Sequence, residues 1–456
     1  MGFVLALCIS YVAFCIGTHP TGPLTTPDSY NYLQASPIYP IGYPLFLKVF
    51  NPDAAIIVQP ILFGAALALL GGQIVRHTRS TLLAVATLAA IIALPQLREF
   101  HASILSESLF GTLLIVFLAL SVRFAYHPTW HLMVLMAFTA GVGGTVRRTA
   151  YALVPVMLIM VLQQRHRLHR SHPTFFLVAA VAPFLAIAGT EQVIAPLLHG
   201  GHTSSLMGRH MFAKAALIDA PPAPIVNDPL TDTLNRHLEH DYAPVRNALA
   251  QAPRDVRAVL SLYYETCMQG GCVDGSRALM PDLVEADQTR RLGNVGVARL
   301  RRAPIAYLDL AALNYQALWT VDRLRDPSRA AAMAAFLDSH RPLLFEQMAM
   351  ALQPGQPMTF QPSPRVRYAQ WFMTMLGFGT AAIAMVGLLG TLSARPLPPL
   401  ATIGSVAALA AHGSLVLTTL LAAGFSRFLQ GVWPAIAMAA VFGAWAVWES
   451  VRRRPA

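Results

Sequence analysis

The feature that most constrains this chain is a series of apolar segments, each close to the length that crosses a lipid bilayer. A hydrocarbon core takes about 20 apolar residues per helix. Only 12% of the 456 residues are charged and 55% are hydrophobic, whereas soluble domains carry roughly 25% charged residues. The sequence therefore predicts an all-α, polytopic integral membrane protein with about ten transmembrane helices. The apolar windows fall at 3–17, 54–75, 81–97, 104–125, 131–146, 149–163, 174–197, 368–392, 399–423 and 432–449.

A long polar segment separates the seventh apolar window from the eighth. Residues 198–366 are far too many for a simple connection between helices. The pieces TDTLNRHLEH, APVRNALAQAPRDVRAVLSLYYET and PIAYLDLAALNYQALWTV within it have helical spacing of their apolar residues. The sequence thus predicts three regions: an N-terminal membrane module at 1–197, a small helical domain at 198–366, and C-terminal membrane helices at 367–456.

The positions of the basic residues predict the orientation. Cytoplasmic loops of membrane proteins carry an excess of Lys and Arg. With the N-terminus in the cytoplasm, the even-numbered loops and the C-terminal tail face the cytoplasm, and they are rich in Arg and His. This topology accounts for the net charge of +11 without a nucleic-acid partner. It places the domain at 198–366 outside the cytoplasm. The Ala-rich composition, with Arg favoured over Lys, is typical of a bacterium, so we expect the inner (plasma) membrane.

Ionisable side chains are predicted to gather at the extracytoplasmic face, because every loop on that side contributes at least one. Two carboxylates and several cations at one face suit a reaction on an anionic lipid headgroup. A carboxylate can accept the proton of an attacking hydroxyl, and guanidiniums can stabilise a departing phosphate. An adjacent arginine pair beside an apolar segment is expensive and usually functional. The candidates are Asp28, Tyr30, Tyr32, Arg98, His101, Glu107, Arg147, Arg148, Lys214 and Arg427.

Several of these residues also have a structural explanation. Asp28 could cap a short interfacial helix, since Asp is a favoured N-cap residue. Glu107 could complement the dipole of the helix that it begins. His101 could be a satisfied polar contact, and Arg427 an ordinary loop cation. Taken one at a time, none of them decides the function, so the prediction rests on their occurrence together.

The first loop holds four tyrosines, which we divide by position. Tyr39 and Tyr43 stand next to prolines just before the second apolar window, so they are predicted to form an interfacial aromatic belt. Tyr30 and Tyr32 stand beside Asp28 and are candidates for substrate contact.

Four cysteines are present. Cys8 and Cys15 fall in the first apolar window and are predicted to pack there. Cys267 and Cys272 are close together in the polar region, where an extracytoplasmic location would permit a disulfide. A zinc site would need two more ligands that their neighbourhood does not offer.

Five short segments resemble the polytopic glycosyltransferases of the GT-C superfamily. They are DSYNY at 28–32, YPIGYPLFL at 39–47, LSESLF at 105–110, GTVRR at 144–148 and SRF at 426–428. The resemblance covers about 1–200 and 366–450, and the helical domain between them has no matching motif. It implies a membrane transferase that uses a sugar carried on a polyprenyl phosphate, such as the protein O-mannosyltransferases and the lipid A aminoarabinose transferase.

The resemblance also implies roles for particular residues. The first-loop acid, Asp28, would be the catalytic base, and Glu107 would assist acceptor binding or position the base. Arg147, Arg148 and Arg427 would hold the lipid phosphate, neutralising a monophosphate without help. Further substrate contacts are assigned to Tyr30, Tyr32, His101 and Lys214.

The chain departs from that family in its first loop, where many relatives have two acids and here Ser29 follows Asp28. A divalent ion would have only Asp28, Glu107 and His101 as ligands. We therefore assign no metal ligand and no cofactor from the sequence.

The sequence thus predicts an inverting glycosyltransferase that moves a monosaccharide from a polyprenyl-phosphate donor to a hydroxyl on a glycan, lipid or protein. A transporter or flippase for a lipid-linked anionic substrate would use the same cations for binding alone. Transporters, however, place their sites near the midplane, often on paired broken helices. A scaffold whose helical domain recruits a partner is the third hypothesis, but it leaves the membrane-embedded arginines without a purpose.

Overall fold

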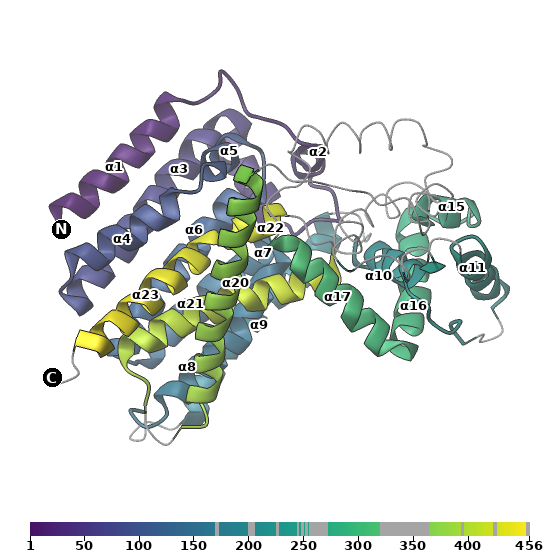
Figure 1. The fold of residues 1–456 in the computed structure, drawn as a ribbon. Helices are drawn as coiled ribbons and strands as arrows, with labels where there is room; N and C mark the ends of the chain where they lie inside the picture. The colour runs from purple at the N-terminus through teal and green to yellow at the C-terminus, as the bar shows by residue number, and fades with distance from the viewer. Residues whose placement is uncertain are drawn as a thin grey trace. The chain divides into compact units, whose positions relative to one another are not determined.

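Figure 1 shows the computed structural model of the chain, which is built from helices. It describes residues 1–168, 173–198, 206–224, 228–243, 246–247, 250, 254, 272–319, 364–393, 396–422 and 426–452. Over those residues no β-strand occurs, and the only strand-like feature is an isolated bridge between Leu24 and Ser103. The prediction of an all-α membrane protein is confirmed.

Among the described residues, six helices are long and apolar enough to cross a membrane. A bent pair, α4 (Thr81–Ile92) and α5 (Gln96–Ala102), makes a seventh span if it is counted as one. All ten predicted windows fall on apolar helices, but the count of about ten spans is not confirmed. The six lie in α3 (Gly42–Thr78), α6 (Ser106–Tyr126), α9 (Pro173–Leu198), α20 (Pro364–Gly390), α21 (Pro399–Leu421) and α23 (Trp433–Arg452). Three shorter apolar helices are α1 (Gly2–Gly17), α7 (Trp130–Val146) and α8 (Leu153–Gln164), which follows the 3-10 turn η1 (Arg148–Ala152).

The described chain divides into two compact units. The first comprises residues 1–201, 376–415 and 429–456, and the second comprises 202–375 and 416–428. The second unit therefore includes the segment at 416–428, which the sequence did not group with the domain predicted at 198–366. Its helices are α10 (Leu206–Leu217), α11 (Pro229–His240), α15 (Cys272–Ala278), α16 (Glu285–Arg302) and α17 (Pro304–Leu318). Most of the predicted helical piece at 243–266 lies outside the described residues.

Within the first unit, helix α3 is the central packing element. It packs along α6, α1 and α4, and α7 packs in turn against α6 and α9 (Figure 1). The element α3 is two helices joined at a kink, where Asn51 has a positive φ of 46°. The Asn51 side chain accepts a hydrogen bond from the Ala54 N–H at 2.9 Å, so it begins the second helix as an N-cap residue would. The membrane-spanning part of α3 thus starts near Pro52, and residues 42–50 form a separate short helix before it.

The short helix at 42–50 approaches the end of α7 at Gly42. A Cβ atom at this position would lie 2.5 Å from Thr145 Oγ1 and 2.7 Å from the Thr145 carbonyl oxygen. Both distances are well inside van der Waals contact, so the first loop and the third loop can meet this closely only because residue 42 has no side chain.

The structure predicts that Gly42→Ala destabilises the first unit by about 1–3 kcal/mol, because the new methyl group overlaps a backbone carbonyl that cannot rotate away. Thermal unfolding in detergent measures the loss. The matched control is Gly189→Ala in α9, where a Cβ would meet no atom within 4 Å. Equal unfolding temperatures for the two variants would contradict the proposed close approach.

The second unit has its own hydrophobic core around α10. Buried apolar side chains from several helices meet there, including Phe212, Leu234 and Leu292. Helix α16 crosses α10 closely at Gly296, where a Cβ would lie 2.6 Å from the backbone nitrogen of Phe212. This unit therefore has an interior of its own and does not depend on bilayer lipid for burial.

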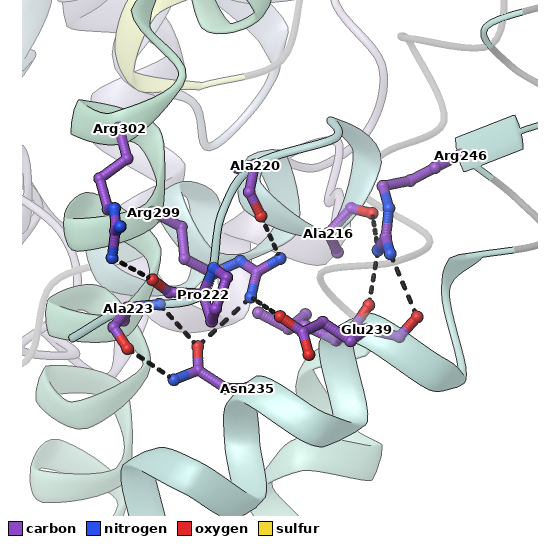
Figure 2. A network of polar contacts seen from close by, with 10 residues as sticks. Ala216, Ala220, Pro222, Ala223, Asn235, Glu239, Arg246, Arg299 and Arg302 are labelled. Atoms are coloured by element: carbon purple, nitrogen blue, oxygen red, sulfur yellow. Dashed lines mark hydrogen bonds and ion pairs between the residues drawn. The ribbon is translucent and has the colours of Figure 1, made fainter. Parts of the chain in front are cut away.

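Buried arginines tie the helix ends of the second unit together (Figure 2). The Arg299 guanidinium is buried, and it donates to the Ala220 carbonyl at 2.6 Å and to Asn235 Oδ1 at 3.3 Å. Arg246 donates to the carbonyls of Leu238 at 2.5 Å and of Glu239 at 3.2 Å, near the C-terminus of α11. These carbonyls have no intrahelical N–H partner, so the arginines satisfy groups that burial would otherwise leave unpaired.

We expect Arg299→Ala to destabilise the second unit by about 3–5 kcal/mol, the usual loss when one partner of a buried charged network is removed. Native-state hydrogen exchange of α11 and α16 measures this change. Arg301→Ala is the control on the same helix, because that side chain is exposed and surface changes stay within about 0.5 kcal/mol. If exchange rises equally in both variants, the network of Figure 2 does not stabilise this unit.

Candidate functional site

The first loop folds into a short helix that carries Asp28. This helix, α2 (Pro27–Leu33), begins with a capping box in which the Thr26 N–H donates to Ser29 Oγ at 2.8 Å. Thr26 is the N-cap residue, so the alternative that Asp28 caps the helix is wrong. Asp28 lies two residues further along, in the first turn, and its side chain is partly exposed.

Backbone hydrogen bonds join the first loop to the second. The Leu24 N–H donates to the Ala102 carbonyl at 2.8 Å, and the Ile104 N–H donates to the Leu24 carbonyl at 3.0 Å. Ser29, on the helix of Asp28, donates its hydroxyl to the Ile104 carbonyl at 2.9 Å. The second loop runs directly into α6, so these bonds bring Asp28 and Glu107 into one region.

The tyrosines of the first loop have different roles from those predicted. Tyr39 was expected in an aromatic belt, but its hydroxyl donates to Asp28 Oδ1 at 2.7 Å. Tyr43, expected in the same belt, is fully buried and donates to Gln59 Oε1 at 3.3 Å. Tyr32 is also buried, and its hydroxyl lies 3.0 Å from Ser106 Oγ. Tyr30 is 64% exposed, and its contact with a substrate stays a prediction.

Glu107 and Arg147 form an ion pair between the second and third loops. Arg147 NH1 lies 2.9 Å from Glu107 Oε1, with side-chain exposures of 12% and 3%. The other carboxylate oxygen, Glu107 Oε2, is buried and has no hydrogen-bond partner among the described residues. A buried carboxylate oxygen is costly when unpaired, so Oε2 is an unsatisfied acceptor in the described fold.

The charges of Asp28, Glu107 and Arg147 all act on the Tyr32 hydroxyl. Burial is the largest cause that raises the pKa of Tyr32, and the negative charges of Glu107 and Asp28 raise it further, whereas Arg147 lowers it. The first three of the loops that the sequence places on one side therefore contribute to one charged cluster around Tyr32.

A second ion pair lies next to this cluster and includes a residue that the sequence did not predict. Arg148 NH1 lies 3.3 Å from Glu191 Oε2 and donates to the Tyr151 hydroxyl at 2.7 Å. Glu191 Oε1 accepts a hydrogen bond of 3.3 Å from the Ile41 N–H. The buried acid on α9 thus connects the third loop with the end of the first.

His101 has a structural role in the described fold. Its ring is fully buried, with Nε2 at 2.9 Å from the Tyr11 hydroxyl and Nδ1 at 2.7 Å from Ser108 Oγ. Both ring nitrogens are therefore occupied by protein atoms, which corrects the expectation that His101 contacts the substrate. Gln59 supports the same loop by donating to the His101 carbonyl at 3.1 Å.

Lys214 and Arg427 belong to the second unit. Lys214 is completely buried and donates to the Thr419 carbonyl at 2.5 Å, and burial lowers the pKa of its ammonium to about 7. With no exposed surface, Lys214 is not available to a substrate in this conformation, contrary to the prediction. Arg427 lies 5.3 Å from the centre of the Phe428 ring, and its assignment to the phosphate stays a prediction.

The cysteine predictions are only partly covered by the structure. Cys8 and Cys15 are free thiols buried in α1, as expected. The proposed pairing of Cys267 with Cys272 lies outside the described residues.

The cluster on the first unit contains one more acid than the sequence indicates. Glu107 pairs with Arg147 and Glu191 with Arg148, and Asp28 accepts a hydrogen bond from Tyr39. The part of the chain that the structure describes contains no group of three or more His, Cys, Asp or Glu side chains arranged to hold a metal ion. The cluster can therefore accept protons and hydroxyl hydrogen bonds, and it can bind an anion through an arginine.

Sequence reasoning missed Glu191, Gln59 and the hydrogen bond of Tyr39. A signal existed for Glu191, because it is an acid inside an apolar window, where ionisable residues are rare and usually functional. No comparable signal existed for Gln59.

Comparisons with protein-family models, with curated proteins and with solved structures found no match for this chain.

We expect Arg147→Gln to lower the stability of the first unit by about 3–5 kcal/mol, because it leaves the buried Glu107 carboxylate without its cation. Thermal unfolding in detergent measures the effect. The double variant Glu107→Gln/Arg147→Gln should regain part of the loss, since it removes the unpaired charge. Strictly additive losses in this double-mutant cycle would contradict the ion pair.

Proposed function

We propose that this protein is a membrane glycosyltransferase that moves a monosaccharide from a polyprenyl-phosphate donor to a hydroxyl acceptor at the extracytoplasmic face. The observation that carries this proposal is the cluster in which Asp28, held by Tyr39, lies near the Glu107–Arg147 pair. A partly exposed carboxylate, a buried acceptor oxygen and guanidiniums together suit the transfer of a sugar away from a phosphate. The GT-C resemblance of the same loops supports the same reaction class.

In the proposed reaction, Asp28 accepts the proton of the acceptor hydroxyl. The acceptor oxygen then attacks the anomeric carbon on the face opposite the phosphate, forming the new glycosidic bond. The bond between the anomeric carbon and the phosphate oxygen breaks, and the polyprenyl phosphate leaves with the electron pair. The configuration at the anomeric carbon is inverted. Tyr39 keeps the Asp28 carboxylate in place through a 2.7 Å hydrogen bond to Oδ1.

The remaining groups of the cluster would bind the sugar and the phosphate. Glu107 would shape the acceptor pocket through its ion pair with Arg147. Arginines suit the leaving phosphate because they stay charged and present several N–H donors in a planar fork. The resemblance also assigns Arg427 to the phosphate, and this assignment stays a prediction because Arg427 belongs to the second unit.

The test is transfer by purified protein in lipid vesicles, with labelled polyprenyl-phosphate sugars and a panel of hydroxyl acceptors. We expect Asp28→Asn to lower the transfer rate by about 10²–10⁴, the usual contribution of a general base, with insertion and thermal stability unchanged. Asp53→Asn is the matched control, because that carboxylate is exposed on α3 and has no role in the proposed reaction.

Three outcomes separate the competing hypotheses. Product formation by the wild type that is lost in Asp28→Asn supports the enzyme. Movement of the labelled lipid across the vesicle membrane without product indicates a transporter. Full transfer by Asp28→Asn would remove Asp28 from the mechanism.

A further inference from the structure

The buried acid Glu191 has a position that the proposed reaction has not yet used. It lies on α9, and its side chain is 2% exposed. Its two oxygens have different partners, the Ile41 N–H for Oε1 and Arg148 NH1 for Oε2. We propose that Glu191 is the positioning residue of the site: one oxygen fixes the end of the Asp28 loop, and the other fixes Arg148 as the arginine that binds the anionic phosphate. This inference rests on the proposed function for the identity of the ligand.

The contact of Oε1 restrains the loop that holds Asp28. Ile41 is the residue just before α3, so its N–H has no partner inside that helix. Glu191 accepts this N–H, and a carboxylate near a helix N-terminus is favoured by the helix dipole as well. Tyr39, the hydrogen-bond donor to Asp28, lies two residues earlier. Loss of the Oε1 contact therefore loosens the segment that places the Asp28 carboxylate.

The contact of Oε2 anchors Arg148 at one end only. Arg148 NH1 donates hydrogen bonds to both Glu191 Oε2 and the Tyr151 hydroxyl. The guanidinium also lies 5.8 Å from the centre of the Tyr151 ring. Its Nε and NH2 groups have no hydrogen-bond partner among the described residues, and the side chain is 46% exposed. An arginine that is held by NH1 and open at NH2 and Nε can form the two parallel hydrogen bonds that phosphates accept.

The neighbouring arginine differs in each of these respects. Arg147 is only 12% exposed, and it pairs with the buried Glu107. The adjacent pair at 147–148 therefore has two separate functions, although the sequence analysis assigns both arginines to the lipid phosphate. Arg147 neutralises Glu107 inside the protein, and Arg148 presents free N–H groups to a ligand.

The glutamine variant separates the two contacts of Glu191. In Glu191→Gln an amide oxygen remains for the Ile41 N–H, while an NH2 group faces the Arg148 guanidinium and can accept nothing from it. In Glu191→Ala both contacts are lost. Gln192→Ala is the matched control, since the next residue along α9 is exposed.

The first experiment measures binding of radiolabelled polyprenyl monophosphate to the full chain in detergent, which needs no transfer activity. We expect Glu191→Gln and Arg148→Ala each to weaken binding about tenfold or more, the scale of a lost charge-assisted hydrogen bond. The double variant should bind no more weakly than Arg148→Ala alone. Unchanged binding in Glu191→Gln, or additive effects in the double variant, would overturn the role of Oε2.

The second experiment measures hydrogen exchange of the segment at 34–47. We expect Glu191→Ala to increase its exchange, and Glu191→Gln to leave it close to that of the wild type. Equal exchange in all variants, or an equal increase in Gln192→Ala, would overturn the role of Oε1. Should Glu191→Ala fail to fold, Ile41→Pro removes the same N–H and provides the comparison.

Kinetics then connect these contacts to catalysis. Glu191→Gln should raise KM for the donor about tenfold with kcat within about twofold, whereas Glu191→Ala should lower kcat as well. A purely structural role would reduce the amount of folded enzyme and leave KM unchanged. If the wild type shows no transfer with any donor, the proposed function fails, and the binding and exchange experiments still decide the role of Glu191.

Discussion

The cost of burying charge governs the arrangement of the first unit. Glu107 and Glu191 are both almost completely buried, and an isolated carboxylate in such a place would be strongly destabilising. Each is paired instead with one of two consecutive arginines, from a segment that continues directly into the 3-10 turn η1. The two acids come from α6 and α9, so the short stretch at 147–148 joins helices that are far apart in sequence. The same pairing leaves Glu107 Oε2 without a hydrogen-bond partner among the described residues.

Much of the fold follows from hydropathy alone, because the bilayer imposes helical structure and a minimum length on any apolar segment. The apolar windows located helices throughout the described chain. They could not show that α4 and α5 meet at a bend of 67°, or that α3 is broken at Asn51. Both features depend on local backbone geometry and tertiary contacts, which hydropathy does not record.

The site was less predictable than the fold, for a physical reason. Topology places loops on one side of a membrane, and that was enough to group Asp28, Glu107 and the arginine pair. It does not say which side chain reaches which partner. Tyr39 and Tyr43 have similar sequence surroundings, yet one binds Asp28 and the other lies in the core with Gln59. His101 shows the opposite case, since a polar residue in the right loop is used to join α1, α5 and α6.

The arginines of the second unit likewise satisfy helix-end carbonyls, so the high Arg content reflects internal packing as well as topology.

The apolar helix α1 has a consequence for the surroundings of the protein. Its outward side chains, including Phe3, Ile9 and Phe14, are apolar and exposed. An apolar face of this kind is stable against lipid tails and costly against water, so detergent must cover this helix whenever the protein is taken out of a bilayer.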